Sequence, residues 1–318
     1  MLQEMLQQIS PLDSAAMEAA RQHWDAIAKP LHSLGRLEDL VVQLAGITGT
    51  ANLPPRKKAV LIFCADNGVV AEGVTQTTQA VTAAVTRNFT KGITSVNALS
   101  RVCGADVFPV DIGVAEELHC DGIISRKIAA GYNLIITGEM GIGNTTTSSA
   151  VFSVLQQLPP EQVTGRGAGL SGAGLRHKVE VIAKAIALHQ PDRNDVLDVL
   201  SKVGGLDICG MAGAFLGGAV YHVPVLIDGF ISAVAANCAV RLVPLCRQYL
   251  FASHCSREPA GKLALEALGL RAYLDCDMCL GEGTGGVIGA KLFDFALAAY
   301  GEIAGFDAVG IAPYEKLQ

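Results

Sequence analysis

The chain has 318 residues, of which 50% are hydrophobic and 17% charged, and its formal net charge is −6. This composition predicts a well-packed globular protein, and the acidic balance without a Lys/Arg run argues against nucleic-acid binding. Because residues 1–20 do not resemble a signal peptide and no apolar run reaches the ~20 residues of a membrane helix, we expect a soluble, cytoplasmic protein away from membranes.

Taken in chain order, the apolar pattern predicts helices at the two ends and strands between them. The first 45 residues have helical spacing and lack a strand. Short apolar runs then predict six strands, at 59–64, 106–111, 134–137, 204–208, 223–228 and 248–253. Helical segments rich in Ala and Leu separate these runs, which predicts an α/β fold with a parallel sheet flanked by helices.

The same pattern suggests how the chain divides into domains. We expect residues 46–285 to form an α/β nucleotide-binding domain. The helical segments 1–45 and 286–318 are expected to pack together as a small helical domain beside it. Five of the six strand ends lead into polar or glycine-rich segments, and ligands of open α/β folds bind at that edge.

Nine cysteines are present, an odd number in a long apolar chain. Cys64 and Cys238 stand in hydrophobic surroundings, where cysteine behaves as a small core residue. Cys276 and Cys279 have CxxC spacing, but a second pair or nearby histidines for zinc are missing. We expect reduced thiols, no metal site and a cytoplasmic protein.

The stretch GEMGIGNTTTSSA (138–150) is the first candidate binding loop. Its glycines allow tight turns, and Asn144 with Thr145–Thr147 could cap a following helix whose N-terminus favours an anion. The Walker lysine is absent, so a magnesium triphosphate is not indicated. Glu139 stands at the mouth of this loop. A tight turn with an ordinary helix cap is the competing interpretation.

Two further glycine-rich stretches carry charged residues. GRGAGL (165–170) precedes a predicted helix with Lys178, which could supply a point charge for phosphate. In LGEGTGG (280–286), Glu282 stands between glycines, so its carboxylate could face a ligand closely as a general base. A solvated helix lysine and a surface-loop glutamate are the competing interpretations.

Together these motifs resemble one family. GEMGIGNTTTSSA, GRGAGL with Lys178, VGGLDICGMAGAFLGGA, PVLIDGFISAVAA and LGEGTGG follow one another in this order, after PLHSLGRLEDL and FCADNGVVAEGVTQTTQAVT. From about Lys29 to about Tyr300 the chain resembles the nicotinate-nucleotide:dimethylbenzimidazole phosphoribosyltransferase family. The resemblance implies a Rossmann-like, six-stranded parallel sheet with a small helical domain, and a homodimer, with a heterodimer as the alternative.

The resemblance also implies a reaction. Enzymes of this family move ribose 5-phosphate from nicotinate mononucleotide to 5,6-dimethylbenzimidazole or a related lower-ligand base of cobalamin-type corrinoids. The products are α-ribazole 5′-phosphate and nicotinate. The leaving pyridinium is already cationic, so neither a metal nor a cofactor is expected. Positive charge builds on the ribosyl carbon, and the acceptor nitrogen attacks from the opposite face.

The site residues follow from the resemblance. Glu282 is the general base and Glu139 gives electrostatic support. The nucleotide and its phosphate are expected at Gly141, Gly143, Asn144, Thr145, Gly167, Lys178, Asp228 and Ser256. The acceptor base is expected at Asp66, Gln79 and Leu280. Asn67 replaces a histidine of many relatives, and Thr77–Thr78 also departs from their pattern, so purines or phenols are alternative acceptors.

Two other functions compete with this one. A phosphoribosyltransferase that uses pyrophosphate-activated ribose needs an acidic pair before a Thr-rich loop, and Asp275 and Asp277 are followed by the wrong pattern. A corrinoid- or nucleotide-binding partner without activity is the non-enzyme alternative. The presence of both Glu282 and Lys178 argues against it.

Overall fold

The protein is an α/β structure built on a parallel sheet; a computed structural model describes residues 2–116 and 124–314. Among these residues the sheet has five strands in the order β2-β1-β3-β4-β5, all parallel. The chain therefore leaves β1 for β2 on one side and crosses to β3 on the other, which creates a switch point. The strands are β1 (Lys58–Cys64), β2 (Ala105–Asp111), β3 (Leu134–Met140), β4 (Val225–Ile227) and β5 (Leu250–Ala252).

The central strands β1 and β3 are buried along their whole length, as the apolar runs at 59–64 and 134–137 predict for those residues. Their register pairs Cys64 with Met140, so β3 continues past the predicted end at residue 137. Glu139 consequently lies within the strand, opposite Phe63, and not in the loop that follows. Pro109 is tolerated in β2 because that strand is at the edge of the sheet.

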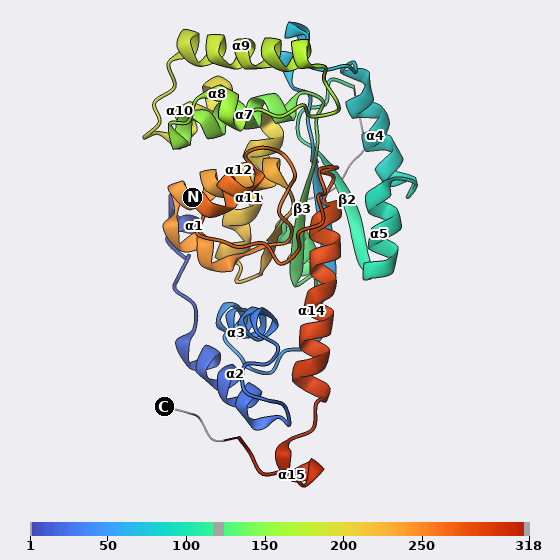
Figure 1. Cartoon of the computed structure of the whole chain (residues 1–318), viewed down its shortest axis with the longest axis vertical. Coiled ribbons are helices and arrows are strands. Elements are labelled where there is room, and N and C mark those ends of the chain that lie inside the picture. Colours follow the sequence, from blue (N-terminus) through green and yellow to red (C-terminus); the bar gives the residue numbers. More distant parts are fainter. Residues whose placement is uncertain (1, 117–123, 315–318) are drawn as a thin grey trace.

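Helices cover both sides of the sheet. Figure 1 shows α11 and α12 on one side of the sheet and α4 and α5 on the other, while α9 lies over α7. The helical segments are α1 (Leu2–Leu6), α2 (Ser14–Ala26), α3 (Arg36–Thr48), η1 (Gly68–Glu72), α4 (Ala80–Thr90), α5 (Ser95–Cys103), α6 (Ile124–Ala129), α7 (Asn144–Gln156), α8 (Pro160–Val163), α9 (Gly172–His189), α10 (Val196–Val203), α11 (Leu206–Val220), α12 (Phe230–Leu242), η2 (Pro244–Tyr249), α13 (Gly261–Ala267), α14 (Thr284–Glu302) and α15 (Phe306–Val309).

The predicted strand at 204–208 was wrong. Gly204 and Gly205 form an extended approach to α11, and the helix begins at Leu206. This helix is buried along most of its length between the sheet and α12, so its sequence is apolar on nearly all sides. A short apolar run of that kind does not distinguish a buried strand from the start of a buried helix.

Residues from the two ends of the described chain contact each other. Trp24 of α2 meets Tyr300 of α14 edge to face, with ring centroids 5.0 Å apart, and Ile27 forms an isolated bridge with Gly305. Figure 1 shows α14 running from the sheet down to α2 and α3. Position 45 falls inside α3, and position 285 is in the first turn of α14. The proposed division into two domains stays a prediction.

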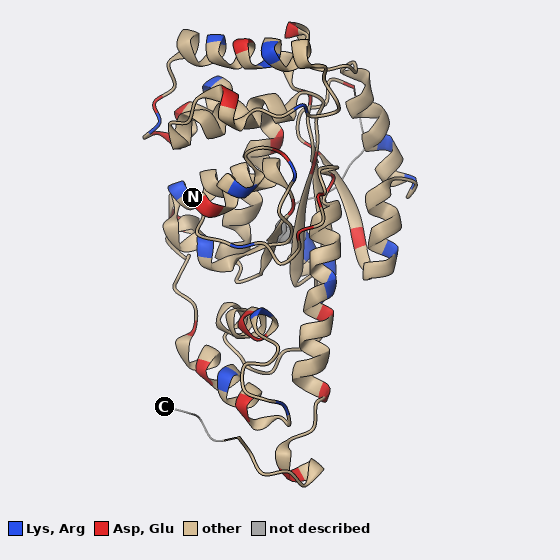
Figure 2. Ribbon diagram, in the orientation of Figure 1, with Lys and Arg blue, Asp and Glu red and all other residues tan. Residues whose placement is uncertain are grey.

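The surface charges match the composition. Figure 2 shows acidic and basic residues interspersed along the outer helices, for example on α9. Within the described ranges, none of the helices combines the length and apolarity required to cross a membrane.

Candidate active site

A cavity of about 260 Å³ lies at the carboxyl ends of β3, β4 and β5. Ligands of open parallel sheets bind at this edge because the loops there leave a crevice. Nearly all the residues predicted from the sequence line this cavity. They are Glu139, Gly141, Gly143, Asn144, Thr145, Gly167, Lys178, Asp228, Ser256, Leu280 and Glu282. The exceptions are Asp66 and Gln79.

Lys178 forms the cationic end of the cavity. Its side chain leaves α9 toward the interior and is 1% exposed, so it is not a solvated helix lysine. The ammonium donates to Thr145 Oγ1 at 2.8 Å and to the Gly165 carbonyl at 3.2 Å. Burial lowers the pKa of Lys178 to about 8, because the charged form has lost its hydration. A bound phosphate would compensate for that loss.

The N-terminus of α7 borders the same end, but the predicted side-chain cap was wrong. The cap position is Gly143, which has a φ of +94° and no side chain with which to cap. The Asn144 amide donates instead to Glu139 Oε2, and the Thr147 hydroxyl donates to Asn67 Oδ1 at 3.2 Å. Gly143, Asn144 and Thr145 nevertheless line the cavity, where the positive end of the helix dipole favours an anion.

Glu139 lies at the end of β3 and is 8% exposed. Burial raises the pKa of its carboxyl well above the usual range, and the nearby Asp207 raises it further. Hydrogen bonds from Asn144 and from the Glu282 backbone act in the opposite direction. Glu139 therefore retains its proton more readily than an ordinary glutamate does. The predicted electrostatic role requires the ionised form, which a cationic ligand would favour.

Glu282 has an unusual backbone conformation, and one of its two carboxyl oxygens lacks a hydrogen-bond partner in the described part of the chain, although the carboxyl also accepts from the Val96 backbone. It has a φ of +62°, and it lies between Gly281 at +83° and Gly283 at +86°. A left-handed glutamate is strained, and such strain gathers at functional sites. Among the described residues, the buried Oε2 atom has no hydrogen-bond partner. Burial raises the pKa of Glu282, with a further contribution from the charge of Asp228.

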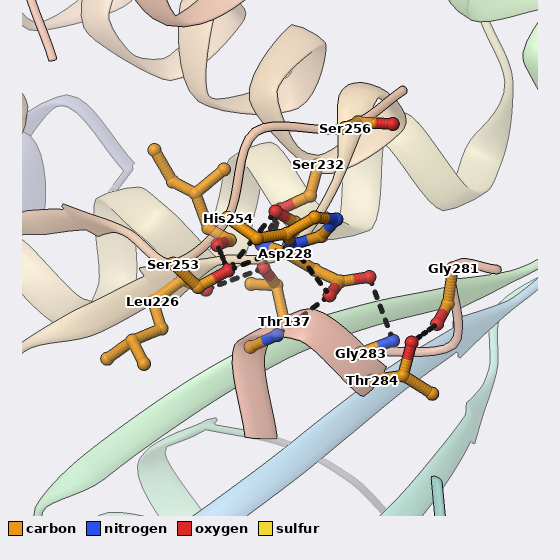
Figure 3. A network of polar contacts seen from close by, with 12 residues as sticks. Thr137, Leu226, Asp228, Ser232, Ser253, His254, Ser256, Gly281, Gly283 and Thr284 are labelled. Carbon is orange, nitrogen blue, oxygen red and sulfur yellow. Dashed lines mark hydrogen bonds and ion pairs between the residues drawn. The ribbon is translucent and has the colours of Figure 1, made fainter. Parts of the chain in front are cut away.

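Asp228, which follows β4, holds the loop that carries Glu282. Its Oδ2 accepts from the Gly283 amide at 3.0 Å and its Oδ1 from the Gly286 amide at 2.8 Å, as Figure 3 shows for Gly283. This carboxylate thus satisfies amides at the N-terminus of α14 that the helix itself leaves free. Burial raises the pKa of Asp228, and the nearby His254 opposes that shift.

Asp66 and Gln79 lie apart from this cavity. The Gln79 amide donates to Asp66 Oδ1 at 2.5 Å, and Asp66 lines a second cavity of about 740 Å³ beside α7, α9, α10 and α11. Asn67 lines the second cavity as well. The segment predicted to contact the acceptor does reach the first cavity, through Thr75 and Gln76.

Several residues of the cavity wall were not predicted from the sequence. Arg166 lies within GRGAGL. Glu258 faces Lys178: burial raises the pKa of the Glu258 carboxyl, and the charge of Lys178 lowers it. His254 is 3% exposed and lines the cavity beside Asp228. Arg166 could have been proposed from its basic character. His254 and Glu258 gave no local signal, because their neighbours come from distant segments of the chain.

Metal ligands do not gather anywhere in the described part of the chain: no cluster of three or more His, Cys, Asp or Glu side chains suited to a metal is found there. Cys276 and Cys279 are both exposed free thiols.

Comparison with known proteins agrees with this geometry. A family model described as a phosphoribosyltransferase matches residues 9–131 and 120–311. The nicotinate-nucleotide–dimethylbenzimidazole phosphoribosyltransferase of Acetivibrio thermocellus is 44% identical over 99% of both chains. The enzyme of the same name from Clostridium acetobutylicum is 42% identical over 100% of this chain and 99% of that one.

A solved structure extends the likeness to the fold. The enzyme of that name from Thermus thermophilus superposes with a TM-score of 0.87 at 34% identity, covering 95% of this chain and 99% of the other. The matched segments include the cavity walls and the loop of Glu282. The chain therefore belongs to the family of nicotinate-nucleotide–dimethylbenzimidazole phosphoribosyltransferases.

Proposed function

We propose that the protein transfers ribose 5-phosphate from nicotinate mononucleotide to 5,6-dimethylbenzimidazole, giving α-ribazole 5′-phosphate and nicotinate. The observation that carries this proposal is a single cavity whose wall brings together a buried lysine, a helix N-terminus and the carboxyl groups of Glu139 and Glu282. The lysine and the helix N-terminus suit a nucleotide phosphate. One carboxyl group suits the cationic ribosyl group, and the other suits an acceptor that loses a proton. The names of the relatives agree with the proposal.

The phosphate would be bound at the cationic end. Lys178 and Thr145 already form a hydrogen-bonded pair there, and Gly167 has a φ of +50° beside both. A methyl group on Gly167 would lie 2.9 Å from Thr145 Oγ1 and 3.6 Å from the lysine Nζ. Glycine therefore keeps the approach to both donors open. A phosphate dianion would favour the charged form of Lys178 and accept hydrogen bonds from this end.

Departure of nicotinate breaks the bond between the ribosyl carbon and the pyridinium nitrogen. The electron pair stays on that nitrogen, which becomes neutral, so the leaving group needs no proton. Positive charge then builds on the ribosyl carbon and ring oxygen. We propose that the cation of the bound nucleotide promotes ionisation of Glu139, whose carboxylate then stabilises the developing charge.

Glu282 would accept the acceptor's proton. The free acceptor nitrogen forms the new bond to the ribosyl carbon from the opposite face, while the N–H proton of its other nitrogen passes to the Glu282 carboxylate. An atom that is buried without a partner is ready to accept such a hydrogen bond. Its raised pKa makes this carboxylate a better base at neutral pH than an ordinary glutamate.

Purine and phenol acceptors are not favoured, because the matched relatives are named for dimethylbenzimidazole. Incubating the enzyme with nicotinate mononucleotide and one base at a time tests the choice. Chromatography and mass spectrometry should find an α-nucleotide of dimethylbenzimidazole at the highest kcat/KM. A higher kcat/KM for adenine or a phenol would decide for the alternative, and absence of transfer to every base would contradict the function.

We also propose a homodimer in the cytoplasm, with the small helical domain formed by residues 1–45 and 286–318. Apolar side chains exposed on neighbouring segments support an interface between copies, namely Leu188, Leu197 and Leu206. The exposed free thiols of Cys276 and Cys279 suit a reducing compartment. Sedimentation analysis of the purified chain tests the dimer, and a monomer at enzymatically active concentrations would contradict it.

A further inference from the structure

We infer that His254 is a positioning residue, which holds Glu282 in its reactive position through Asp228 and the first turn of α14. The inference rests on the proposed role of Glu282 as the base. It adds a residue that no local sequence pattern singles out, and it explains how a strained glutamate keeps its conformation.

The imidazole of His254 packs against glycines from two different elements. A methyl group on Gly285 would overlap the ring and lie 2.7 Å from its Cγ. A methyl group on Gly229 would lie 3.6 Å from Cε1 and from Nε2, in ordinary van der Waals contact. Since Gly285 belongs to the first turn of α14, the ring presses directly on the helix that follows Glu282.

The Nδ1 edge of the ring faces two oxygens. Nδ1 lies 3.3 Å from Ser253 Oγ and 3.9 Å from Asp228 Oδ1. The single hydroxyl hydrogen of Ser253 is directed at the Ile227 carbonyl, 2.6 Å away, so its oxygen is free to accept. The proton therefore belongs on Nδ1, where it faces both Ser253 and the Asp228 carboxylate. Figure 3 shows His254 and Ser253 around Asp228.

Asp228 passes this constraint to the catalytic loop. Its two oxygens accept the amides of Gly283 and Gly286, on either side of Gly285. From the opposite side, β3 presses on the same loop: a methyl group on Gly138 would lie 2.7 Å from the Glu282 carbonyl oxygen. The loop is thus clamped between β3 and the His254–Asp228 pair. Left-handed glutamate persists only where the surroundings determine it from several sides.

A direct role is the competing explanation, because His254 also lines the cavity and its Nε2 could contact the substrate. Two substitutions separate the roles. In His254→Asn the side-chain amide nitrogen lies near the place of Nδ1, whereas in His254→Gln it lies near the place of Nε2. Positioning through Asp228 requires the Nδ1 group, and a substrate contact requires the Nε2 group.

The test measures kcat and KM for nicotinate mononucleotide with dimethylbenzimidazole as acceptor. His254→Gln should lower kcat by about 10²-fold with little change in KM, since a displacement of about 1 Å at a reacting group can cost that much. His254→Asn should lower kcat by less than about tenfold. His32→Gln, at an exposed histidine of the terminal segment, is the matched control and should behave as wild type.

A double mutant tests whether His254 acts through Glu282. In a Glu282→Gln background, His254→Gln should cause no further loss of kcat, because groups that act as a unit are not additive. Additive losses would overturn the inference, as would a larger loss in the Asn variant or a loss confined to KM. Circular dichroism checks folding. If His254→Gln does not fold, the kcat of His254→Asn compared with that of the control His32→Gln still tests the inference.

The proposed base and the positioning residue fail in different ways. Wild-type turnover of Glu282→Gln would overturn the proposed base. Wild-type turnover of His254→Gln, beside a Glu282→Gln variant of low turnover, would overturn the positioning role alone.

Discussion

Replacement of Glu282 by glutamine is the most direct test of the proposed chemistry. Glutamine keeps the length and one hydrogen-bonding oxygen of the side chain but cannot take the proton of the acceptor. The backbone need not change, because the left-handed φ of +62° is held by Gly283, Asp228 and β3 and not by the carboxylate. The change therefore removes proton transfer while it leaves the shape of the cavity intact.

General base catalysis contributes about 10²–10⁴-fold, so kcat should fall by that factor, which corresponds to about 2.7–5.5 kcal/mol of activation free energy. The binding of nicotinate mononucleotide should survive, because the cationic end of the cavity is formed by Lys178 and Thr145. Burial of the orphan oxygen adds a second expectation. The variant should unfold at a temperature equal to or above that of wild type, since a half-buried carboxylate, one oxygen of which has no partner among the described residues, is replaced by a neutral amide.

The assay compares two acceptors, of which one has an N–H group and the other a methyl group on the same nitrogen. Benzimidazole must lose its N–H proton to give a neutral product, whereas 1-methylbenzimidazole has none to lose. The ratio of wild-type to variant turnover should be large for the first acceptor and small for the second. Glu302→Gln, at the exposed far end of α14, is the matched control. Equal losses with both acceptors, or near wild-type turnover with benzimidazole, would refute the role of Glu282.

The other groups of the cavity can be tested one at a time. Lys178→Ala should weaken nicotinate mononucleotide binding about 10–100-fold by calorimetry, as loss of a charge-assisted hydrogen bond does, whereas Lys184→Ala on the exposed face of α9 should not. In wild type this binding should also weaken as pH rises through about 8, where the free enzyme loses the Lys178 charge. The pKa of Glu139 is higher in the folded protein than in the unfolded chain. Protonation of this carboxyl therefore stabilises the fold fully below the unfolded pKa of about 4.3, and this stabilisation is lost as pH rises through the folded pKa. Glu139→Gln should therefore raise Tm at pH 8 by a few degrees, about 2–4 °C per kcal/mol, while it lowers turnover; an unchanged or lower Tm would contradict this. Exhaustive chelation should leave turnover intact because the cationic leaving group needs no Lewis acid, and a loss restored by magnesium would contradict that expectation.

The elements that the sequence predicts best are those whose environment is uniform. β1 and β3 are buried on both faces, and their continuous apolar sequences report that directly. The prediction of a strand at the start of α11 was wrong because a short apolar run does not distinguish a strand from the first turn of a buried helix; Asp207 and Ile208 are buried there, but the segment is helical. Five strands in the described ranges, and not six, are the result.

The site was predicted mainly through its glycine-rich loops. The loops beside Glu282 and Lys178 made both residues candidates, and the resemblance to the family assigned them to the site; both line the cavity. It could not show that Asn144 bonds to Glu139 and does not cap α7, since that choice depends on the register of β3. His254 could not be predicted from the sequence for a similar reason. Its partners Asp228 and Gly285 lie 26 and 31 residues away, and only the order of the strands brings them together.

Helix α14 gives the molecule a mechanical property. It is one unbroken helix of 19 residues, or about 28 Å, with the Glu282 loop at its first turn and Tyr300 near its last. The Tyr300 ring contacts Trp24, and its hydroxyl donates to the Ala51 carbonyl at 3.1 Å. The helix packs on α3, α5 and β3, which hold it in place along its length. A tilt of about 2° about Tyr300 would move the catalytic loop by about 1 Å, so this packing contributes to the precision of the site. Changes in the packing of α2, remote from any substrate, would then be felt as changes in turnover.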